Sequence, residues 1–302
     1  TGTTSPHDST TDFFNYELPR TGSIVGTKYE DKNGDGNWDS GEQGLGGWTI
    51  QLVKGDTVIA TTTTNSSGNY SFSNVAAGNY TIREIQQTGW GTVSGATRPV
   101  TVIAGQTTGT TTPADASTDF FNFKYGCIEG EKYYDKDADG CIDEGECTIA
   151  GWKVYLYEVK DGVKCETPVA CTFTDEYGKY KFGNVEPGKY IVVEDQPEGW
   201  NSKGPTSYEV CVEPGEVYGD GEGEDTDFLN YEYACIEGEK YYDADRSGDK
   251  TEGDFGISGW KITLYAAKDG VKCGEPIACT YTDCYGAYKF GKLDPGSYVI
   301  VE

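Results

Sequence analysis

An eight-residue string near the start of the chain returns twice, and this repetition constrains the fold more than any other feature. TDFFNYEL, TDFFNFKY and TDFLNYEY occupy residues 11–18, 118–125 and 226–233. Each later copy closes a unit of roughly a hundred residues, a period that indicates tandem copies of one small domain. The sequence therefore predicts an N-terminal segment and three repeats, at residues 1–18, 19–125, 126–233 and 234–302.

Within each unit, short runs of alternating apolar and polar residues are separated by Gly, Pro and Asp. Examples are KVYLYEV at 153–159 and KYIVVE at 189–194. A period of two indicates half-buried strands, and turn residues at intervals of about 8–12 residues are typical of a β-sandwich. The sequence predicts an all-β protein built from seven-stranded antiparallel β-sandwich repeats.

The third repeat is predicted to be incomplete. It stops at YVIVE (298–302), which matches YIVVE (190–194) of the second repeat, where two more strand-like strings follow. Two interpretations remain open. In one, the sequence is part of a longer chain of repeats. In the other, residues 11–18 of one subunit complete the third repeat of the next subunit by β-strand addition, which would give a head-to-tail homopolymer.

The charge of the chain limits its partners. Asp and Glu number 50 against 24 Lys and Arg, so the formal net charge is −26. Binding to nucleic acid or to anionic lipid needs clusters of Lys and Arg, and we therefore expect neither partner. No stretch approaches the roughly 18 apolar residues that a membrane-spanning helix requires.

Cysteine and histidine usage points to a non-enzymatic protein outside the cell. Ten cysteines in an acidic, Tyr-rich chain without a CxxC pair favour an oxidising, extracellular compartment over a zinc or redox site. The only histidine, His7, lies in the polar N-terminal segment. No Ser/His/Asp or Cys/His set can be assembled around it, so we expect no enzymatic activity.

Three acidic loops carry the most specific chemical pattern. DKNGDGNWDSGE (31–42) and DKDADGCIDEGE (135–146) follow the twelve-residue calcium-loop pattern, with Gly36 and Gly140 at the sixth, sharply turning position. DADRSGDKTEGD (243–254) fits less well because it ends in Asp and contains an Arg. Strand-like strings flank the loops, so we expect Ca²⁺ sites on a β-scaffold; the alternative is metal-free, solvated turns. The candidate ligands are Asp31, Asn33, Asp35, Asn37, Asp39, Glu42, Asp135, Asp137, Asp139, Cys141 through its carbonyl, Asp143, Glu146, Asp243, Asp245, Ser247, Asp249 and Asp254.

The cysteines lie only in the second and third repeats. Cys127 and Cys211 correspond to Ser23 and Thr101 of the cysteine-free first repeat, so both cysteines are present in the second repeat and both are absent from the first. We predict four disulfides, Cys127–Cys211, Cys141–Cys147, Cys165–Cys171 and Cys273–Cys279. Cys235 and Cys284 remain; either they pair, or Cys235 bonds to another chain.

The order of these motifs resembles a known family. A first strand, DxNxDGxxDxGE, a Gly-Trp strand, GxYxF, GxYxxxE and TDFxN follow one another as in the B repeats of staphylococcal serine-aspartate surface proteins. The pattern is also similar to the collagen-adhesin B-type domains, which have a prealbumin-like sandwich fold. The resemblance covers nearly the whole chain and implies a structural protein of the cell surface.

Two functions are expected. In the first, calcium-stabilised repeats self-assemble head to tail by strand donation into a filament, sheath or surface layer. The alternative is an adhesin stalk or a carbohydrate- or ligand-binding module in a longer cell-surface protein, with other envelope components or surface glycans as partners. For that alternative, Trp38, Trp90 and Trp200 are expected to be exposed for stacking on sugars.

The resemblance also implies an internal amide (isopeptide) bond. In the collagen-adhesin B-type family a Lys of the first strand is joined to an Asn of the last strand, promoted by a Glu. The matching residues are Lys28, Glu84 and Asn122 in the first repeat and Lys132, Glu194 and Asn230 in the second. The third repeat holds Lys240 and Glu302, and the unassigned counterpart of the Asn is Asn15. The alternative is that each Lys is exposed to solvent and each Asn only forms a turn, with no bond between them. Separately, Asn65 begins an N-glycosylation sequon in a predicted turn.

Overall fold

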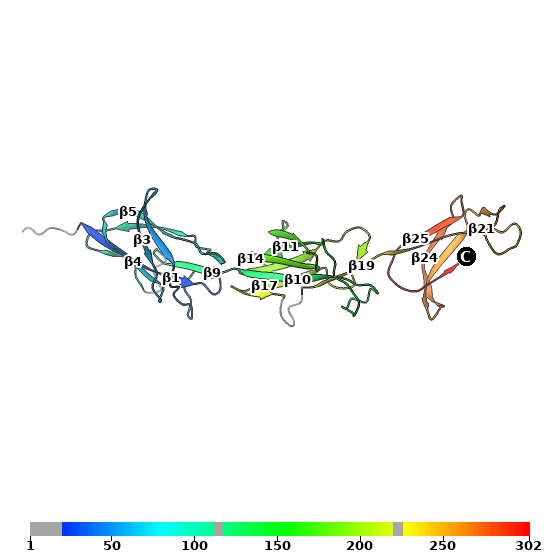
Figure 1. The fold of residues 1–302 in the computed structure, drawn as a ribbon, viewed down its shortest axis with the longest axis horizontal. Coiled ribbons are helices and arrows are strands. Elements are labelled where there is room, and N and C mark those ends of the chain that lie inside the picture. Colours follow the sequence, from blue (N-terminus) through cyan, green and yellow to red (C-terminus); the bar gives the residue numbers. More distant parts are fainter. Residues whose placement is uncertain (1–19, 112–116, 220–225) are drawn as a thin grey trace, which may run out of the picture. The chain divides into compact units, whose positions relative to one another are not determined.

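In the computed structural model, residues 20–111, 117–219 and 226–302 of the chain are described, and the secondary structure over these ranges consists of β-strands (Figure 1). The predicted all-β class is confirmed. The candidate donor segment at 1–18, which includes His7 and Asn15, lies outside the described residues. Across the described ranges, no helix is long and apolar enough to cross a membrane.

The first repeat is a sandwich of two sheets. One sheet has the order β4-β1-β9-β6, with β8 also paired to β1, and the other has the order β3-β2-β5-β7. The strands are β1 (Thr21–Glu30), β2 (Thr49–Lys54), β3 (Thr57–Thr63), β4 (Asn69–Ala76), β5 (Gly78–Glu84), β6 (Trp90–Gly91), β7 (Thr97–Val102), β8 (Thr107–Thr108) and β9 (Phe120–Lys124).

The second repeat has the same two sheets. Their orders are β14-β10-β19-β16, with β18 paired to β10, and β12-β11-β15-β17, with β13 paired to β11. The strands are β10 (Gly126–Tyr134), β11 (Lys153–Lys160), β12 (Val163–Lys164), β13 (Ala170–Phe173), β14 (Lys179–Val185), β15 (Gly188–Glu194), β16 (Trp200–Asn201), β17 (Ser207–Val212), β18 (Val217–Tyr218) and β19 (Phe228–Glu232).

The third repeat contains fewer strands. They form one three-stranded sheet, β24-β23-β26, and two separate pairs, β20-β25 and β21-β22. The strands are β20 (Ala234–Glu239), β21 (Tyr241–Tyr242), β22 (Phe255–Gly256), β23 (Lys261–Lys268), β24 (Val271–Tyr281), β25 (Ala287–Leu293) and β26 (Tyr298–Val301). Up to Glu302, this repeat has no counterpart of β7, β8 or β9.

The closing strand of a complete repeat differs from the purely antiparallel arrangement that the sequence predicts. β9 runs parallel to β1, with Lys28 opposite Phe120, and β19 runs parallel to β10, with Lys132 opposite Phe228. A closing strand that comes late in the chain is not joined to the first strand by a hairpin, so nothing in the connection requires an antiparallel pair. The TDFxN string therefore lies along the first strand of its own repeat.

Alternation along the strands builds each core. In β1 the side chain of Ile24 is fully buried, and Gly26 and Lys28 lie on the same face. Ile50, Leu52 and Ile82 of the opposing sheet are fully buried against it. The inward face of β1 thus carries one lysine among apolar residues, which creates the site described below.

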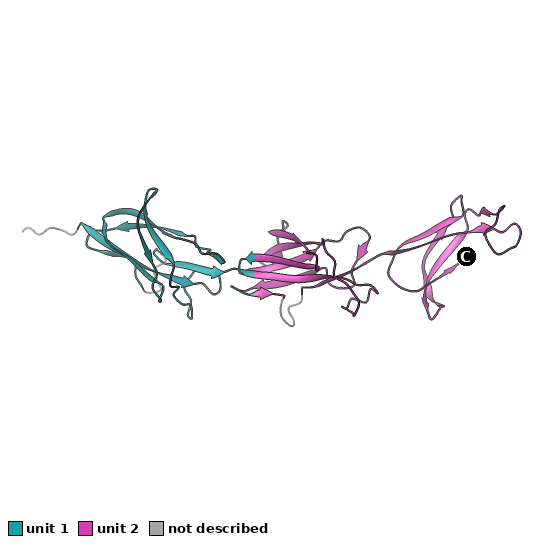
Figure 2. Ribbon diagram, viewed as in Figure 1, with its two compact units in different colours: residues 1–126, 184–187, 213–216 teal, residues 127–183, 188–212, 217–302 magenta. Residues whose placement is uncertain are grey.

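By contact density the chain divides into two compact units (Figure 2). One comprises residues 1–126, 184–187 and 213–216, and the other comprises the remaining residues. Contact density thus does not separate the second repeat from the third, whereas the strand pattern repeats with the period seen in the sequence.

Candidate functional site: buried Lys–Glu–Asn clusters and acidic loops

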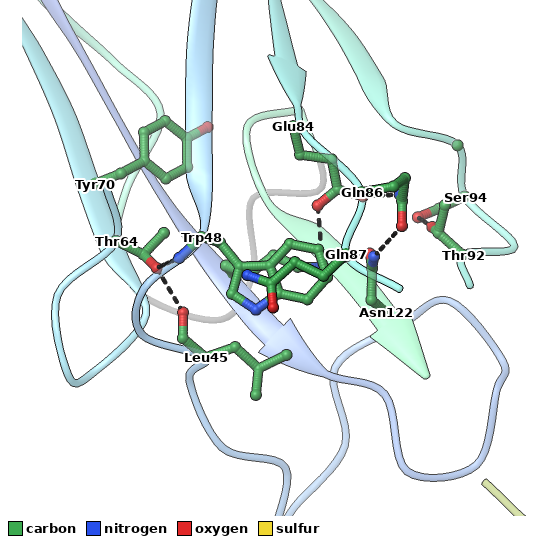
Figure 3. A network of polar contacts seen from close by, with 12 residues as sticks. Leu45, Trp48, Thr64, Tyr70, Glu84, Gln86, Gln87, Thr92, Ser94 and Asn122 are labelled. Carbon is green, nitrogen blue, oxygen red and sulfur yellow. Dashed lines mark hydrogen bonds and ion pairs between the residues drawn. The ribbon is translucent and has the colours of Figure 1, made fainter. Parts of the chain in front are cut away.

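A lysine, a glutamate and an asparagine meet inside the first repeat. Lys28 comes from β1, Glu84 from the end of β5 and Asn122 from β9, and all three are buried. Lys28 Nζ lies 3.1 Å from Glu84 Oε2 and donates a hydrogen bond to Asn122 Oδ1. Figure 3 shows Glu84 and Asn122 close together beside the Trp48 ring.

The second repeat reproduces this cluster. Lys132 Nζ lies 3.0 Å from Glu194 Oε2 and donates to Asn230 Oδ1. The side chains of Lys132 and Glu194 are fully buried, as is Asn230. The structure thus brings together the six residues that the resemblance implied, and it excludes the alternative of solvated lysines.

The strand register places these groups. Lys28 is drawn inward because it shares the face of Ile24, and its partner across the parallel pair is Phe120, two residues before Asn122. In β5, Ile82 and Glu84 point into the core on alternate positions. Since the same registers recur for β10, β15 and β19, the geometry is a property of the fold and not of one repeat.

A tryptophan forms a wall of each cluster. The Trp48 ring is 4.6 Å from Lys28 Nζ, and the Trp152 ring is 4.6 Å from Lys132 Nζ, within the range of a cation–π contact. Each ring is held edge-on by a second tryptophan, with centroids 5.6 Å apart for Trp48 and Trp90. The sequence analysis missed this contact, although the recurrence of the Gly-Trp pair in register was the available signal.

Two glutamines complete the clusters, and these residues were also missed. Gln86 Nε2 donates to Glu84 Oε1 at 2.6 Å, and Gln86 Oε1 accepts from Asn122 Nδ2 at 2.9 Å (Figure 3). Gln196 makes the same 2.6 Å bond to Glu194. A Gln two residues after the Glu in both repeats is visible in the sequence. These bonds orient the carboxyl group and the amide relative to each other.

Burial favours the neutral forms of Lys28, Lys132 and Glu194 in these clusters. Burial lowers the pKa of Lys28 to about 8, although Glu84 opposes the shift. It lowers the pKa of Lys132 to about 8 in the same way. Burial also raises the pKa of Glu194 to about 7 against the effect of Lys132. A lysine that can lose its proton is a nucleophile, and a protonated carboxyl beside an amide can polarise it.

The third repeat contains part of the same arrangement. Lys240 Nζ lies 2.5 Å from Glu302 Oε2 and 5.3 Å from the Trp260 ring. However, the side chain of Lys240 is 25% exposed and that of Glu302 is 58% exposed, in contrast to the fully buried pairs of the other repeats. Asn15, the residue that the register assigns to this position, lies outside the described residues.

The acidic loops are held by their first and last carboxylates. Asp31 is fully buried and accepts N–H groups of Gly34, Asp35 and Gly36. Glu42 closes the loop by accepting the N–H groups of Lys32 and Asp39. The equivalent carboxylates of the other loops, Asp135 with Glu146 and Asp243 with Asp254, do the same.

The sixth position of each loop has the backbone conformation that a calcium loop needs. Gly36, Gly140 and Gly248 have φ angles of 77°, 83° and 80°. This left-handed region is open to glycine at no steric cost, which explains its recurrence at this point. The predicted sharp turns are therefore present.

Two of the loops gather carboxylates closely enough to hold a metal ion. Oxygen atoms of Asp135, Asp137 and Asp139 lie within 4.8 Å of one another, and so do those of Asp243, Asp245 and Asp254. Neighbouring carboxylates, Asp139 first, raise the pKa of Asp143. Mutual repulsion between hard oxygen ligands is relieved by a divalent cation, so the donor chemistry fits such an ion.

Some candidate ligands are hydrogen-bonded within their own loops. Ser247 Oγ donates to the carbonyl of Asp249 at 2.9 Å, and the carboxylate group there consists of Asp243, Asp245 and Asp254. In the first loop, Asn33 Nδ2 donates to Asp39 Oδ2 at 2.8 Å. Asp254 accepts the N–H groups of Ala244 and Thr251, so it occupies the closing position that Glu42 and Glu146 occupy in the other loops.

Comparison with known proteins assigns the family. The SdrD B-like domain family matches residues 22–124, 130–209 and 238–302. The chain belongs to this family. It is therefore made of cell-surface repeats of a non-enzymatic family, as the sequence predicted.

The relatives are surface proteins of staphylococci. Serine-aspartate repeat-containing protein D of Staphylococcus aureus (strain MW2) is 28% identical over 288 residues, 90% of this chain and 21% of that protein. Serine-aspartate repeat-containing protein F of Staphylococcus epidermidis (strain ATCC 12228 / FDA PCI 1200) is 34% identical over 178 residues, 57% of this chain and 11% of that protein. The chain thus spans about a fifth or less of the length of these relatives.

The similar chains among solved structures have low identity and low TM-scores. The Bacillus anthracis TIE protein has a TM-score of 0.34 and 20% identity, covering 93% of this chain and 45% of that chain. The minor pilin GBS52 of Streptococcus agalactiae has a TM-score of 0.30 and 14% identity, covering 70% of this chain and 96% of that chain.

The predicted disulfides are not present in these SdrD B-like repeats, where all ten cysteines are free. Cys127 lies beside Glu129 on the outer face of β10, whereas Cys211 is exposed between buried Val210 and Val212 on the outer face of β17. The two thiols thus lie on opposite sheets of the sandwich. The presence of both cysteines in the second repeat and their absence from the first do not show which sheet each one lies on.

The hairpin cysteines are also too far apart. Cys165 lies opposite Glu158 of β11 and Cys171 lies opposite Tyr155. In the third repeat, Cys279 and Cys273 lie opposite Thr263 and Ala266 of β23. Three residues along a strand separate Cα atoms by about 10 Å, and a disulfide needs about 4.4–6.8 Å.

The remaining cysteines are also unpaired. Cys141 of the second acidic loop and Cys147, directly after that loop, are both exposed free thiols. Cys235 lies near the Leu293 end of the β20–β25 pair, whereas Cys284 lies in the turn before β25 begins at Ala287. Opposite ends of a strand pair cannot be joined by one disulfide.

Two predictions about the surface have different outcomes. Trp90 and Trp200 are half-buried against Trp48 and Trp152, so they are not the exposed sugar platforms that were expected, while Trp38 is 38% exposed. Asn65 is exposed in the turn before β4, where its Oδ1 accepts the N–H groups of Ser67 and Asn69. Its glycosylation stays a prediction.

Proposed function

We propose that these SdrD B-like repeats form a load-bearing stalk segment of a cell-surface adhesin, locked by Lys28–Asn122 and Lys132–Asn230 amide bonds. The observation that supports this is the pair of fully buried Lys–Glu–Asn clusters. Each lysine amine already contacts the amide oxygen of its asparagine and the carboxyl group of its glutamate.

The bond forms by aminolysis of the asparagine amide. The neutral lysine Nζ attacks the side-chain carbonyl carbon, while the protonated glutamate donates to the carbonyl oxygen and withdraws electrons from it. Collapse of the tetrahedral intermediate expels the asparagine nitrogen, which leaves as ammonia after the glutamate relays a proton from Nζ. One C–N bond forms and one breaks, so no oxidant, reductant or cofactor is consumed.

The placement of the crosslink suits a stalk. It joins the first strand of a repeat to its last, so a pulling force that enters at β1 leaves at β9 without passing through the strands between them. Half-burial of Trp90 and Trp200 supports a packing role for these rings, and this favours a stalk over a sugar-binding module.

Mass spectrometry tests the proposal. The intact protein is expected to be lighter than its sequence mass by two ammonia molecules, and digestion should yield branched peptides that join β1 to β9 and β10 to β19. The Asn122→Ala variant serves as the matched control and should lose one ammonia fewer. A protein at its full sequence mass would refute the crosslinks.

Calcium is proposed as the second stabilising element. The residues that would hold it are the three-carboxylate groups of the second and third loops. In the first loop, Asp31, Asn33 and Asp35 occupy the positions of Asp135, Asp137 and Asp139. A bound Ca²⁺ would supply a hard positive charge that neutralises these carboxylates. Because Asp31 and Asp135 directly follow the lysine-bearing strands, loop order and cluster geometry are physically linked.

A further inference from the structure

The two clusters differ in one inward-facing residue of the strand beside the glutamate. Arg98 of β7 lies opposite Ile82 of β5. Tyr208 of β17 lies opposite Val192 of β15, the equivalent position of the second repeat. Both side chains are half-buried between exposed neighbours, so they face the core. Since Ile82 and Val192 stand two residues before the cluster glutamates and on the same face, an arginine borders the first cluster and a tyrosine borders the second.

Arg98 places a fixed positive charge beside the closing strand of the first repeat. Its Nη1 donates to the carbonyls of Ser94 and Gly95, both at 2.9 Å, and its guanidinium carbon lies 4.9 Å from the centre of the Phe120 ring. Burial lowers the pKa of Arg98, and Glu84 is the strongest of the acidic groups that oppose this shift. The charges of Arg98 and Glu84 therefore attract each other inside the repeat.

The second repeat has a neutral hydrogen-bond donor in place of this cation. Tyr208 donates its hydroxyl to the carbonyl of Asp227 at 2.5 Å, and its ring centre is 5.1 Å from that of Phe228. It thus binds the closing strand without bringing a positive charge to Glu194. Burial raises the pKa of Glu194 to about 7, so the protonated form of this carboxyl group is available near neutral pH.

The asparagine amides differ as well. In the first repeat, Asn122 Nδ2 donates to Gln86 Oε1 at 2.9 Å (Figure 3). In the second repeat, Asn230 Nδ2 is buried and has no hydrogen-bond partner among the described residues. A buried donor without a partner raises the free energy of the reactant state. Because aminolysis expels this nitrogen as ammonia, the second cluster loses an unfavourable group on reaction, whereas the first must break a hydrogen bond.

We propose that the second repeat forms its amide bond before the first, and that Arg98 is the positioning residue that delays the first. This inference rests on the proposed crosslinking function. In both repeats the lysine Nζ bonds to the side-chain carbonyl carbon of the asparagine, the bond from that carbon to Nδ2 breaks, and ammonia leaves. Arg98 contributes no atom to the products and acts through Glu84. The carboxyl group must be protonated to donate to the asparagine carbonyl, and a neighbouring guanidinium stabilises the carboxylate instead.

The order is tested on the full chain, isolated unfolded in denaturant and folded by rapid dilution near neutral pH. Samples quenched in acid at successive times are digested, and mass spectrometry quantifies the branched Lys28–Asn122 and Lys132–Asn230 peptides. The Lys132–Asn230 peptide should accumulate roughly three- to tenfold faster, the effect that one neighbouring charge has on a buried group. Both rates come from the same samples, so the folding conditions are identical. Equal rates, or an earlier first crosslink, would overturn the proposed order.

Removal of the charge tests whether Arg98 causes the delay. Arg98→Gln should speed the first crosslink roughly three- to tenfold and leave the second unchanged, whereas Arg98→Lys keeps the charge and should stay slow. Arg98→Tyr introduces the residue of the second repeat and should also speed the reaction, which covers the case that Gln hinders folding. Arg83→Gln removes a charge from the exposed face of β5 and is the matched control. A residue needed only for packing would slow the reaction when replaced, so the absence of acceleration in both Arg98→Gln and Arg98→Tyr would contradict the role.

Failure of this inference and failure of the crosslinks give different results. If neither branched peptide forms, the proposed function is wrong and the order falls with it. If both peptides form at the same rate, or the Arg98 variants change nothing, the crosslinks stand and only this inference is overturned.

Discussion

A buried lysine beside a buried glutamate is a poor source of stability. Desolvation of both charges offsets most of their attraction, and apolar residues of similar volume are often at least as stabilising. Yet Lys28 with Glu84 and Lys132 with Glu194 are fully buried in separate repeats. A reaction explains this arrangement, because an amide bond converts the charged amine into a neutral group that suits the core.

At the residue scale, replacement of the glutamate should prevent amide-bond formation and leave the packing of the cluster unchanged. Glu194→Gln keeps the shape of the side chain but cannot relay a proton, so the second repeat should remain uncrosslinked while the first reacts. The intact mass should then show one ammonia lost and not two. Glu209→Gln on the exposed face of β17 is the matched control and should leave both losses unchanged. Two losses in Glu194→Gln would exclude the catalytic role.

The pKa values of the second cluster predict a bell-shaped pH dependence of bond formation. Lys132 attacks as the neutral amine, and with a pKa of about 8 that form increases as pH rises. Glu194 acts while protonated, and with a pKa of about 7 that form decreases as pH rises. Refolding of denatured, uncrosslinked chains at different pH values, followed by intact mass, should give the fastest rate between about pH 7 and 8. A rate that rises steadily to high pH would contradict the role of Glu194.

At the scale of elements, a threonine fixes the tryptophan wall of each cluster. Thr64 Oγ1 accepts the N–H of Trp48 at 3.0 Å and donates to the carbonyl of Leu45 at 2.7 Å (Figure 3). Thr174 makes the same two bonds in the second repeat. One buried hydroxyl therefore joins the start of β2 to the end of β3.

Replacement of this hydroxyl group should destabilise the first repeat. Thr64→Val preserves volume but leaves the buried Trp48 N–H unpaired, which should lower the free energy of unfolding by about 1–3 kcal/mol. Thermal or denaturant unfolding measures the change, and it is best made in the Asn122→Ala background, where no crosslink masks it. Thr63→Val, on the exposed side of β3, is the control. Equal stability of the two variants would remove the structural role of Thr64.

Calcium bound in the second acidic loop should stabilise the repeat that contains this loop. At a hundredfold excess over its dissociation constant, a bound ion adds about 2.7 kcal/mol of stability, so chelation should lower the melting temperature measurably. Asp135→Asn should abolish the calcium-dependent increment of the second repeat, because its fully buried carboxylate anchors the loop. Glu144→Gln, an acidic residue outside the ligand positions, is the control and should keep the increment. A melt that is identical in calcium and in chelator would contradict the metal site.

Particular residues show how far sequence reasoning reached. The family resemblance located the buried clusters, and the period of two in a strand explains why Lys28 lies on the same buried face as Ile24. The calcium-loop spacing identified the turns at Gly36 and Gly140. These features are local, and local patterns can be seen in one sequence.

The failures involve information that is not local. The parallel pairing of β9 with β1 depends on how distant strands meet, and the cysteine faces depend on which sheet each strand joins. Gln86 and Gln196 recur in register, yet only the structure shows that they bond to the glutamates.

At the scale of the whole molecule, the crosslinks determine how the chain responds to force. Lys28 and Asn122 are 94 residues apart, and Lys132 and Asn230 are 98 residues apart. An amide bond between these side chains transmits the force directly from the first strand to the last, so the residues between them are not extended. An uncrosslinked repeat would release more than about 300 Å of extended chain.

Single-molecule stretching of the full chain from its two ends tests the stalk function most directly. The first and second repeats should give no unfolding step of that length, and the Asn122→Ala variant should regain one such step. Two long steps, of about 300 Å or more each, in the unaltered chain would contradict the account.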